Sequence, residues 1–336
     1  MTYRHWLRPL TSLLLLLHCS AGCAGHAARM KAHGSGAKQP TYAIINMHEH
    51  IQSPAEAEKL LETMDNTGIV RTVLLGSPKE TLVGKGGFVE YDENNAQILT
   101  IQTTYPNSFT AFTTMNPRDP DKLRKLQGYI RAGAKGVKLY SGHSKFYDLP
   151  LTDPEMDPVY AYLEQQQLPI MFHINLGQFL GEFEALMAQH PKMVVILPHL
   201  GLSSIRLTRL ESLLDRYPRL YTDLSFGYDP FLVAALRRIS ATPEKYREFI
   251  QRHQDRVLFG SDMVVTKHER KTAEWLTGVI QCYRRMLETE RYRCSLVGDE
   301  ELNGLALSPN VLHQIYEVNP QKVLGSSGKK KQSKRR

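Results

Sequence analysis

The stretch Ile44-Ile45-Asn46-Met47-His48-Glu49-His50 is a short apolar run that ends in two histidines. Three later apolar runs also end in a side chain that can bind a metal: Pro169-Ile170-Met171-Phe172-His173, Val194-Val195-Ile196-Leu197-Pro198-His199 and Val257-Leu258-Phe259-Gly260-Ser261-Asp262. Ligands at the ends of strands converge only if the strands lie side by side and run in the same direction. The pattern therefore predicts a parallel barrel whose strand ends share one mouth.

The rest of the chain supplies the other strands that such a barrel needs. Eight β-rich runs alternate with segments of helical periodicity, and we expect strands at Ala43–His48, Arg71–Gly76, Phe109–Asn116, Gly136–Tyr140, Pro169–Asn175, Val194–Gly201, Leu220–Ser225 and Val257–Asp262. Strand–helix alternation implies a parallel sheet with right-handed crossovers. The predicted fold class is α/β, a (β/α)8 TIM barrel formed by residues 42–324 as a single domain, with a last helix within 308–324.

The formal net charge of +8 comes from the two ends of the chain. Residues 1–41 and 325–336 carry basic residues and no acid, so the part between them is mildly acidic. We therefore expect a small-molecule substrate and no nucleic acid as partner. Residues 325–336 are expected to form a disordered basic tail, and the oligomeric state stays open.

Residues 1–23 have the features of a secretory signal peptide. Arg4 and Arg8 precede the leucine-rich run 10–17, which is too short to span a bilayer, and Ser20-Ala21-Gly22-Cys23 resembles a lipobox. We expect an exported protein, either periplasmic or held at the membrane by a lipid on Cys23, with residues 24–41 as a flexible tether. Cys282 and Cys294 are then candidates for a disulfide in an oxidising compartment.

The His-x-His pair sets the geometry of the predicted metal site. Residues two apart in a strand point to the same side, so His48 and His50 aim together into the mouth and Glu49 points away or to the rim. A single histidine of this kind is more often a core or surface residue than a ligand. Four such positions at the ends of the first, fifth, sixth and eighth strands favour a shared cation.

These residues resemble the amidohydrolase superfamily, in its amidohydrolase-related branch of hydrolases and nonoxidative decarboxylases. The resemblance covers most of residues 42–324 and rests on His48-Glu49-His50, His173, Pro198-His199-Leu200-Gly201, Tyr221-Thr222-Asp223-Leu224-Ser225 and Leu258-Phe259-Gly260-Ser261-Asp262. Asn46 departs from the aspartate that the branch commonly has there. That change would alter how the first two histidines are oriented rather than remove a ligand.

The resemblance implies a divalent metal, most simply Zn²⁺, on His48, His50, His173 and Asp262. Such a metal lowers the pKa of bound water to roughly 7 and polarises a carbonyl. Asp262 would act as general base, and His199 would help to polarise the substrate oxygen. In some members a lysine at the end of the fourth strand is carboxylated and bridges two metals, which makes Lys138 a candidate ligand for a second ion. Its alternative is an unmodified lysine that pairs with Asp262 or with a substrate anion.

Three functions stay open from the sequence. The first is a hydrolase that acts on a C–O or C–N bond of a lactone, amide or ester-like small molecule; Lys138 favours it. The second is a nonoxidative decarboxylase of an aromatic or unsaturated acid, which needs a cation such as Arg206 near the mouth. The third is a non-catalytic metal-binding lipoprotein. We expect Arg206, Tyr140 and His143 to contact substrate, and loops 77–91 and 141–147 to line the mouth.

Overall fold

The computed structural model describes residues 42–227 and 229–325, so the expected signal peptide, the tether and the tail beyond residue 325 lie outside the described residues. Its main sheet has eight strands that pair in parallel in the order of the chain. The strands are β1 (Ile44–Glu49), β2 (Ile69–Leu75), β3 (Phe109–Thr114), β4 (Gly136–Gly142), β5 (Pro169–Ile174), β6 (Val194–Leu197), β7 (Leu220–Asp223) and β8 (Val257–Leu258).

The first and last strands meet through backbone hydrogen bonds, which nearly close the sheet. Met47 N donates to Phe259 O over 2.9 Å, and Asp262 N donates to His48 O over 2.8 Å. The (β/α)8 TIM barrel predicted from the sequence is therefore confirmed.

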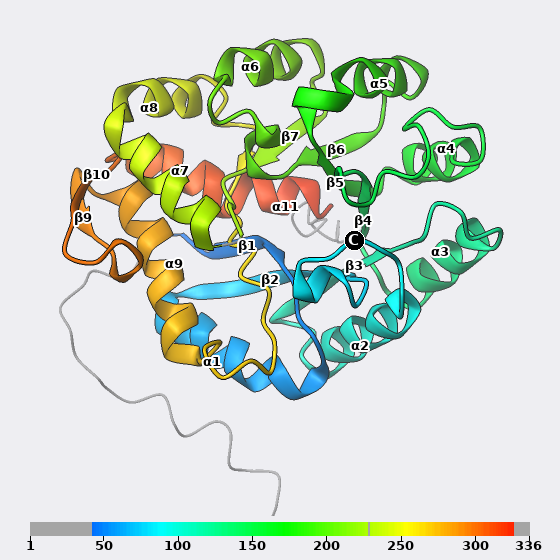
Figure 1. Cartoon of the computed structure of the whole chain (residues 1–336), viewed down its shortest axis with the longest axis horizontal. Helices are drawn as coiled ribbons and strands as arrows, with labels where there is room; N and C mark the ends of the chain where they lie inside the picture. The colour runs from blue at the N-terminus through cyan, green and yellow to red at the C-terminus, as the bar shows by residue number, and fades with distance from the viewer. Residues whose placement is uncertain (1–41, 228, 326–336) are drawn as a thin grey trace, which may run out of the picture. The chain divides into compact units, whose positions relative to one another are not determined.

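Helices follow the strands and surround the barrel (Figure 1). They are α1 (Ala57–Thr67), α2 (Tyr91–Thr104), α3 (Lys122–Arg131), α4 (Asp157–Gln166), α5 (Leu176–Gln189), α6 (Leu207–Arg216), α7 (Asp229–Ala241), α8 (Pro243–Arg252) and α9 (Ala273–Glu288). Their apolar stripes explain this packing. In α6, for example, Leu207, Leu210 and Leu214 are buried and the charged residues between them are not. Short 3-10 turns include Thr81–Val83 in the β2–α2 loop and His199–Leu202 after β6.

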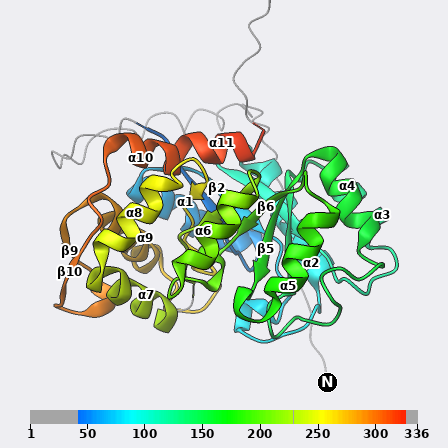
Figure 2. The same ribbon diagram turned by 90° about the horizontal axis from the view of Figure 1, so that it is seen from above.

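One end of the barrel is covered by the C-terminal helices α10 (Pro309–His313) and α11 (Asn319–Val323), which Gln314–Val318 joins in one helical run (Figure 2). Val323 packs with the side chains inside the barrel, such as Ile45, Val73 and Ile196. The sequence predicted this run as a last helix. It leaves the opposite end, where the carboxyl ends of the strands lie, for the site.

The hairpin of β9 (Arg291–Arg293) and β10 (Glu301–Asn303) is tied to the barrel by a disulfide. Cys282 in α9 and Cys294 after β9 are bonded, with 5.3 Å between their Cα atoms. The pairing considered from the sequence is thus present in the structure. Within the described residues, no helix combines the length and the apolar character needed to cross a membrane.

Candidate metal centre

Three imidazoles converge on one carboxylate at the carboxyl ends of the strands. Asp262 Oδ1 lies 3.4 Å from His48 Nε2 and 3.4 Å from His50 Nε2, and Asp262 Oδ2 lies 3.7 Å from His199 Nε2. Residues of β1 and of the segments after β6 and β8 therefore meet around one point. His48, His50 and Asp262 form one group whose ligand atoms all lie within 4.8 Å of one another.

The other ring nitrogen of each imidazole is fixed by an acceptor. His48 Nδ1 donates to Asp223 Oδ2 over 2.7 Å, and His199 Nδ1 donates to Ser225 O over 2.9 Å. His50 Nδ1 lies 2.7 Å from Ser77 Oγ, whose hydroxyl already donates to Leu75 O, so this oxygen accepts. With the proton on Nδ1, each Nε2 presents a lone pair to the shared point, as a metal ligand must.

Burial keeps these imidazoles neutral. It lowers the pKa of His48 to about 3, with Lys138 adding to the effect, and it also lowers the pKa values of His50 and His199. Neutral imidazole is the form that binds a metal. Burial raises the pKa of Asp262 against the opposing charge of Lys138. A cation at this point would favour the ionised carboxylate.

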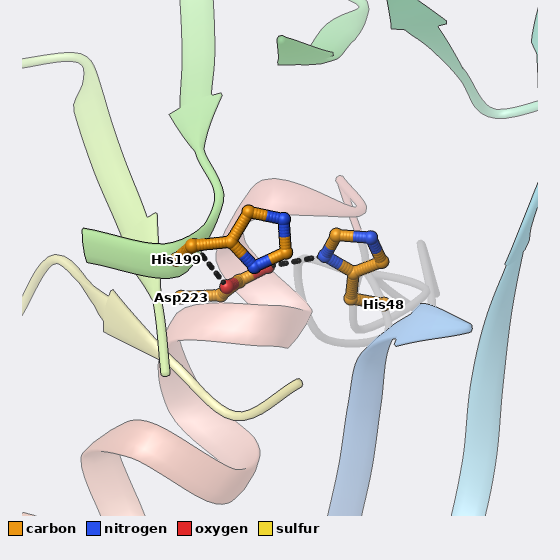
Figure 3. A group of neighbouring side chains, drawn as sticks. All are labelled: His48, His199 and Asp223. Carbon is orange, nitrogen blue, oxygen red and sulfur yellow. Dashed lines mark hydrogen bonds and ion pairs between the residues drawn. The ribbon is translucent and has the colours of Figure 1, made fainter. Parts of the chain in front are cut away.

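Asp223 at the end of β7 organises two of these histidines, and the sequence reasoning gave it no site role. One of its oxygens accepts from His48 Nδ1, and the other accepts from the backbone N of His199 over 2.9 Å (Figure 3). This second oxygen also accepts from Ser225 Oγ over 2.6 Å. Burial alone would raise its pKa, but His48 and the other donors hold it low. The available signal was its position, since Asp223 lies near the end of the predicted strand Leu220–Ser225, as the ligands lie near the ends of theirs.

Two of the residues whose side chains converge have a strained backbone conformation. His199 has a φ of 59° and Asp262 a φ of 54°, both in the left-handed region that residues with a Cβ rarely adopt. The hydrogen bonds from His199 N to Asp223 and from Asp262 N to His48 O hold these conformations. The strain is stored at residues that meet at one point, which is typical of a functional site.

Asn46 and Glu49 connect β1 to the segment after β8. Asn46 Nδ2 donates to Ser261 Oγ over 2.7 Å, and Asn46 Oδ1 accepts from Ser261 N. Glu49 points away from the mouth but does not reach an open rim, because it is fully buried and accepts from Ser261 Oγ and Val264 N. Burial raises its pKa. These contacts position the loop that carries Asp262.

The remaining predicted residues have different places. His173 makes no hydrogen bond through its side chain within the described residues; its ring lies 5.0 Å from that of His199 and 4.5 Å from that of His143. Lys138 is buried in β4, with Nζ 5.2 Å from the centre of the Tyr140 ring, and burial lowers its pKa against the carboxylates of Asp262 and Asp223. His173 and Lys138 thus lie beside the converging group on the β4–β5 side.

Tyr140 and His143 line the cavity above the site, whereas Arg206 does not. The hydroxyl of Tyr140 donates to Gly76 O over 2.9 Å. His143 Nδ1 accepts from Lys145 N over 3.0 Å, so its Nε2 carries the proton and is a donor, the reverse of the converging histidines. Arg206 is exposed at the start of α6 and is not among the residues that line the cavity, because that loop turns Ser204 and Ile205 toward it instead.

The cavity over the converging group has a volume of about 990 Å³. Both loops expected at the mouth contribute to it, through residues 81–85 and through His143, Lys145 and Phe146. Sequence reasoning missed the contribution of α7 and of the segment after β8, which includes Arg238 and Lys271. Neither residue follows a predicted strand closely enough for the pattern to identify it.

The residues present fit a divalent metal. His48 Nε2 is buried and has no hydrogen-bond partner within the described residues, although a buried polar atom is normally satisfied. Its lone pair, with those of His50 and His199 and the Asp262 carboxylate, makes a nitrogen and oxygen donor set suited to Zn²⁺ and related ions. His48, His50 and Asp262 would hold the metal, with His199 at 3.7 Å from the same carboxylate.

Comparison with known proteins places this site in a family. The family model described as amidohydrolase matches residues 39–326, so the chain belongs to the amidohydrolase-2 family of the amidohydrolase superfamily. This family includes hydrolases and decarboxylases and typically binds a divalent metal. The resemblance recognised in the sequence is confirmed. No curated protein sequence matches the chain.

Solved structures show the same fold at low identity. A probable 2-pyrone-4,6-dicarboxylic acid hydrolase from Acinetobacter baumannii, with citric acid bound, matches with a TM-score of 0.58 and 14% identity over 84% of this chain and 99% of that one. A 4-oxalomesaconate hydratase from Rhodopseudomonas palustris matches with a TM-score of 0.54 and 16% identity over 84% of this chain and 95% of that one. A 2,6-dihydroxybenzoate decarboxylase complexed with 2,6-dihydroxybenzoate matches with a TM-score of 0.52 and 16% identity over 86% of this chain and 100% of that one.

Proposed function

We propose that this protein is a metal-dependent hydrolase that cleaves a C–O or C–N bond in a lactone, amide or ester-like small molecule. One observation carries the proposal: three Nε2 lone pairs converge on Asp262 while their Nδ1 atoms are held elsewhere. The bound metal, which we take to be Zn²⁺, would supply a Lewis acid that lowers the pKa of water and polarises a carbonyl.

The chain's own residues supply the proton transfers. Asp262 lines the cavity, and its Oδ2 lies 3.7 Å from His199 Nε2, so this carboxylate would take a proton from the attacking water and pass it to the leaving group. His199, fixed by Ser225 O, would orient the substrate oxygen. Tyr140 and His143 line the substrate side, and His143 Nε2 is oriented as a hydrogen-bond donor.

Carboxylation of Lys138 would supply an anionic ligand for a second metal. The amine would add CO₂ through its nitrogen lone pair and release a proton, giving an anionic carbamate. The proposal is supported by the position of Lys138, buried at β4 between the converging group and Tyr140. Metal content measured with and without bicarbonate tests it. A second equivalent should appear in the wild type and be lost in Lys138→Ala, and one equivalent under every condition would contradict it.

A nonoxidative decarboxylase is the second candidate, and one observation favours it. Arg238 and Lys271 line the cavity, and within the described residues neither pairs with a carboxylate. A decarboxylase needs such cations to hold its acid substrate. We favour the hydrolase because Asp262 is positioned to act as a general base toward a water molecule and because Lys138 offers a ligand for a second metal.

A substrate panel on metal-loaded protein separates the candidate functions. Lactones, esters and amides should be hydrolysed by the wild type, and Asp262→Asn should abolish turnover. Release of CO₂ from aromatic or unsaturated acids without hydrolysis would replace the hydrolase by the decarboxylase. Bound metal with no turnover in either panel would support the non-catalytic metal-binding protein.

We propose that the protein is exported, as a periplasmic protein or a lipoprotein. The Cys282–Cys294 disulfide supports this, since such bonds persist in oxidising compartments. Cell fractionation with thiol labelling tests it. The protein should be found outside the cytoplasm with Cys282 and Cys294 unreactive toward the thiol label. Cys23→Ala should release it from membranes if a lipid is attached. Recovery of free thiols in the cytoplasm would contradict export.

A further inference from the structure

The mouth of the cavity carries several exposed apolar side chains. Among the described residues, the three most exposed large hydrophobic side chains are Ile205, Phe231 and Val83, at 69%, 67% and 66% exposure. All three line the cavity, together with Leu202. They come from three separate segments, namely the loops after β2 and β6 and helix α7. Exposed apolar side chains that gather at one place mark a binding site.

Helix α7 presents one face to this cavity. The lining residues Phe231, Ala234, Ala235 and Arg238 have the spacing i, i+3, i+4 and i+7, which places them in one stripe along the helix. The stripe is apolar at its beginning and ends in a guanidinium. Arg238 Nη1 donates to Ser204 Oγ over 2.9 Å, which fixes it beside the loop that carries Ile205. An apolar surface and a cation are therefore held next to each other.

The walls carry more cations than carboxylates. Lys145 Nζ donates to Gly84 O over 2.8 Å, and Lys271 Nζ donates to Met263 O over 2.6 Å, so both use backbone oxygens. Within residues 42–227 and 229–325, neither they nor Lys85 and Arg238 form an ion pair with an acid. The lining acids are Asp262, at the candidate metal centre, and Asp229, which pairs with Arg270.

We propose that the substrate is an amphiphilic organic acid. Its carboxylate is bound by Arg238 and Lys271, and its hydrocarbon portion lies on Ile205, Phe231, Leu202 and Val83. The cavity volume of about 990 Å³ suits a small molecule rather than a polymer. The inference rests on the proposed function, because it names the substrate class of the same site.

Binding of a homologous series measures both parts of this proposal. Straight-chain carboxylates from butanoate to decanoate, and their primary amides, are titrated calorimetrically into the metal-loaded protein. Affinity should rise about fourfold per methylene, the order expected when a CH₂ group is buried. Each acid should bind at least about tenfold more tightly than its amide, as hydrogen bonds to charged groups allow. Equal affinity along the series, or equal affinity of acid and amide, would overturn the proposal.

Two pairs of variants locate the two subsites. Ile205→Ser combined with Phe231→Ser should halve the gain per methylene, whereas Val70→Ser, at an exposed position away from the cavity, should leave it unchanged. Arg238→Gln should weaken acids about tenfold and leave amides unaffected. Arg237→Gln is its control, since the neighbouring Arg237 pairs with Glu300. Equal effects of a variant and its control would count against the assigned subsite, and thermal melting checks that each variant folds.

Failure of this inference can be told apart from failure of the proposed function, because binding is measured without turnover. If the acids bind as expected but no ester, lactone or amide is hydrolysed, the substrate class stands and the hydrolase falls. If short neutral lactones are hydrolysed as fast as charged amphiphilic ones, the hydrolase stands and the substrate class falls.

Discussion

The two sides of the site hold their imidazoles in different ways. On the side formed by β1 and by the segments after β6 and β8, His48, His50 and His199 each have Nδ1 fixed by an acceptor, and every Nε2 faces Asp262. On the side of β4 and β5, His173 is held by ring contacts, and His143 presents a proton rather than a lone pair. The difference indicates that the first side presents lone pairs to a cation, whereas His143 on the second side presents a proton donor to the cavity.

The largest expected effect is loss of a histidine from the first side. His48→Ala should remove the metal and abolish activity, because it deletes a lone pair and leaves Asp223 without its imidazole partner. Metal analysis by mass spectrometry checks this, with His190→Ala, a histidine outside the cavity, as control. Full metal content in His48→Ala would break the comparison at once.

Asp223→Asn should have the next largest effect. The amide cannot accept as strongly from His48 Nδ1, so the imidazole loses its fixed proton position, and metal affinity should fall about 10- to 100-fold. Competition with a chelator measures the affinity. Asp215→Asn is a matched control, because Asp215 is an acid of the surface that pairs with Arg252.

Gly227→Ala tests how closely the first side is packed. Gly227 has a φ of 61°, and a Cβ there would lie 2.3 Å from Asp262 Oδ2. The left-handed conformation costs a residue with a Cβ roughly 1–2 kcal/mol, and the clash would also displace the carboxylate. We expect weaker metal binding together with a lower melting temperature. Gly181→Ala, in helix α5 with open space around it, should show neither change.

His143→Ala should have a small effect and only on catalysis. The variant removes a donor on the substrate side, so metal content should stay at the wild-type level while kcat/KM falls by up to about tenfold. His143→Gln, which restores a donor, should recover part of the loss. Loss of metal in His143→Ala would mean that the second side also holds the cation, against the comparison.

The smallest effect on the site is expected from the disulfide, which lies outside both sides. Replacing Cys282 and Cys294 by Ala opens a link with a sequence separation of 12 and should cost about 3 kcal/mol of unfolding free energy by the chain-entropy account. Denaturant unfolding measures this cost, and metal affinity of the folded variant should be unchanged. A parallel fall in affinity would show that α9 supports the site.

The barrel was predictable from the sequence because its strands carry their own signal. Apolar runs that end in His or Asp are local features, and parallel pairing then places those ends together. The part that could not be predicted depends on contacts between distant segments. Asp223 becomes a partner of His48 only when closure of the barrel places β7 one strand away from β1, and Arg238 reaches the cavity only through the orientation of α7.

Arg206 is the converse case: its sequence position predicted a site residue, but it does not line the cavity. It follows a predicted strand closely, yet the left-handed residues from His199 to Leu202 redirect the chain, so Ser204 and Ile205 face the cavity instead. Backbone turns of this kind have no signature in side-chain periodicity. The burial of Glu49 could not be predicted for the same reason, because it depends on contacts with Ser261 and Val264 from the segment after β8.

The hydrogen bond from Asp262 N to His48 O joins the beginning of the barrel to its last strand segment. Because His48 and Asp262 are more than two hundred positions apart in the sequence, a fragment that lacks either end of the barrel lacks part of the binding site. A barrel in which the segment after β8 has not paired with β1 should therefore bind no metal ion. Metal binding during refolding should report the moment at which these two segments pair. A tightly bound ion would in turn stabilise the whole barrel rather than one segment, since it binds only the native state.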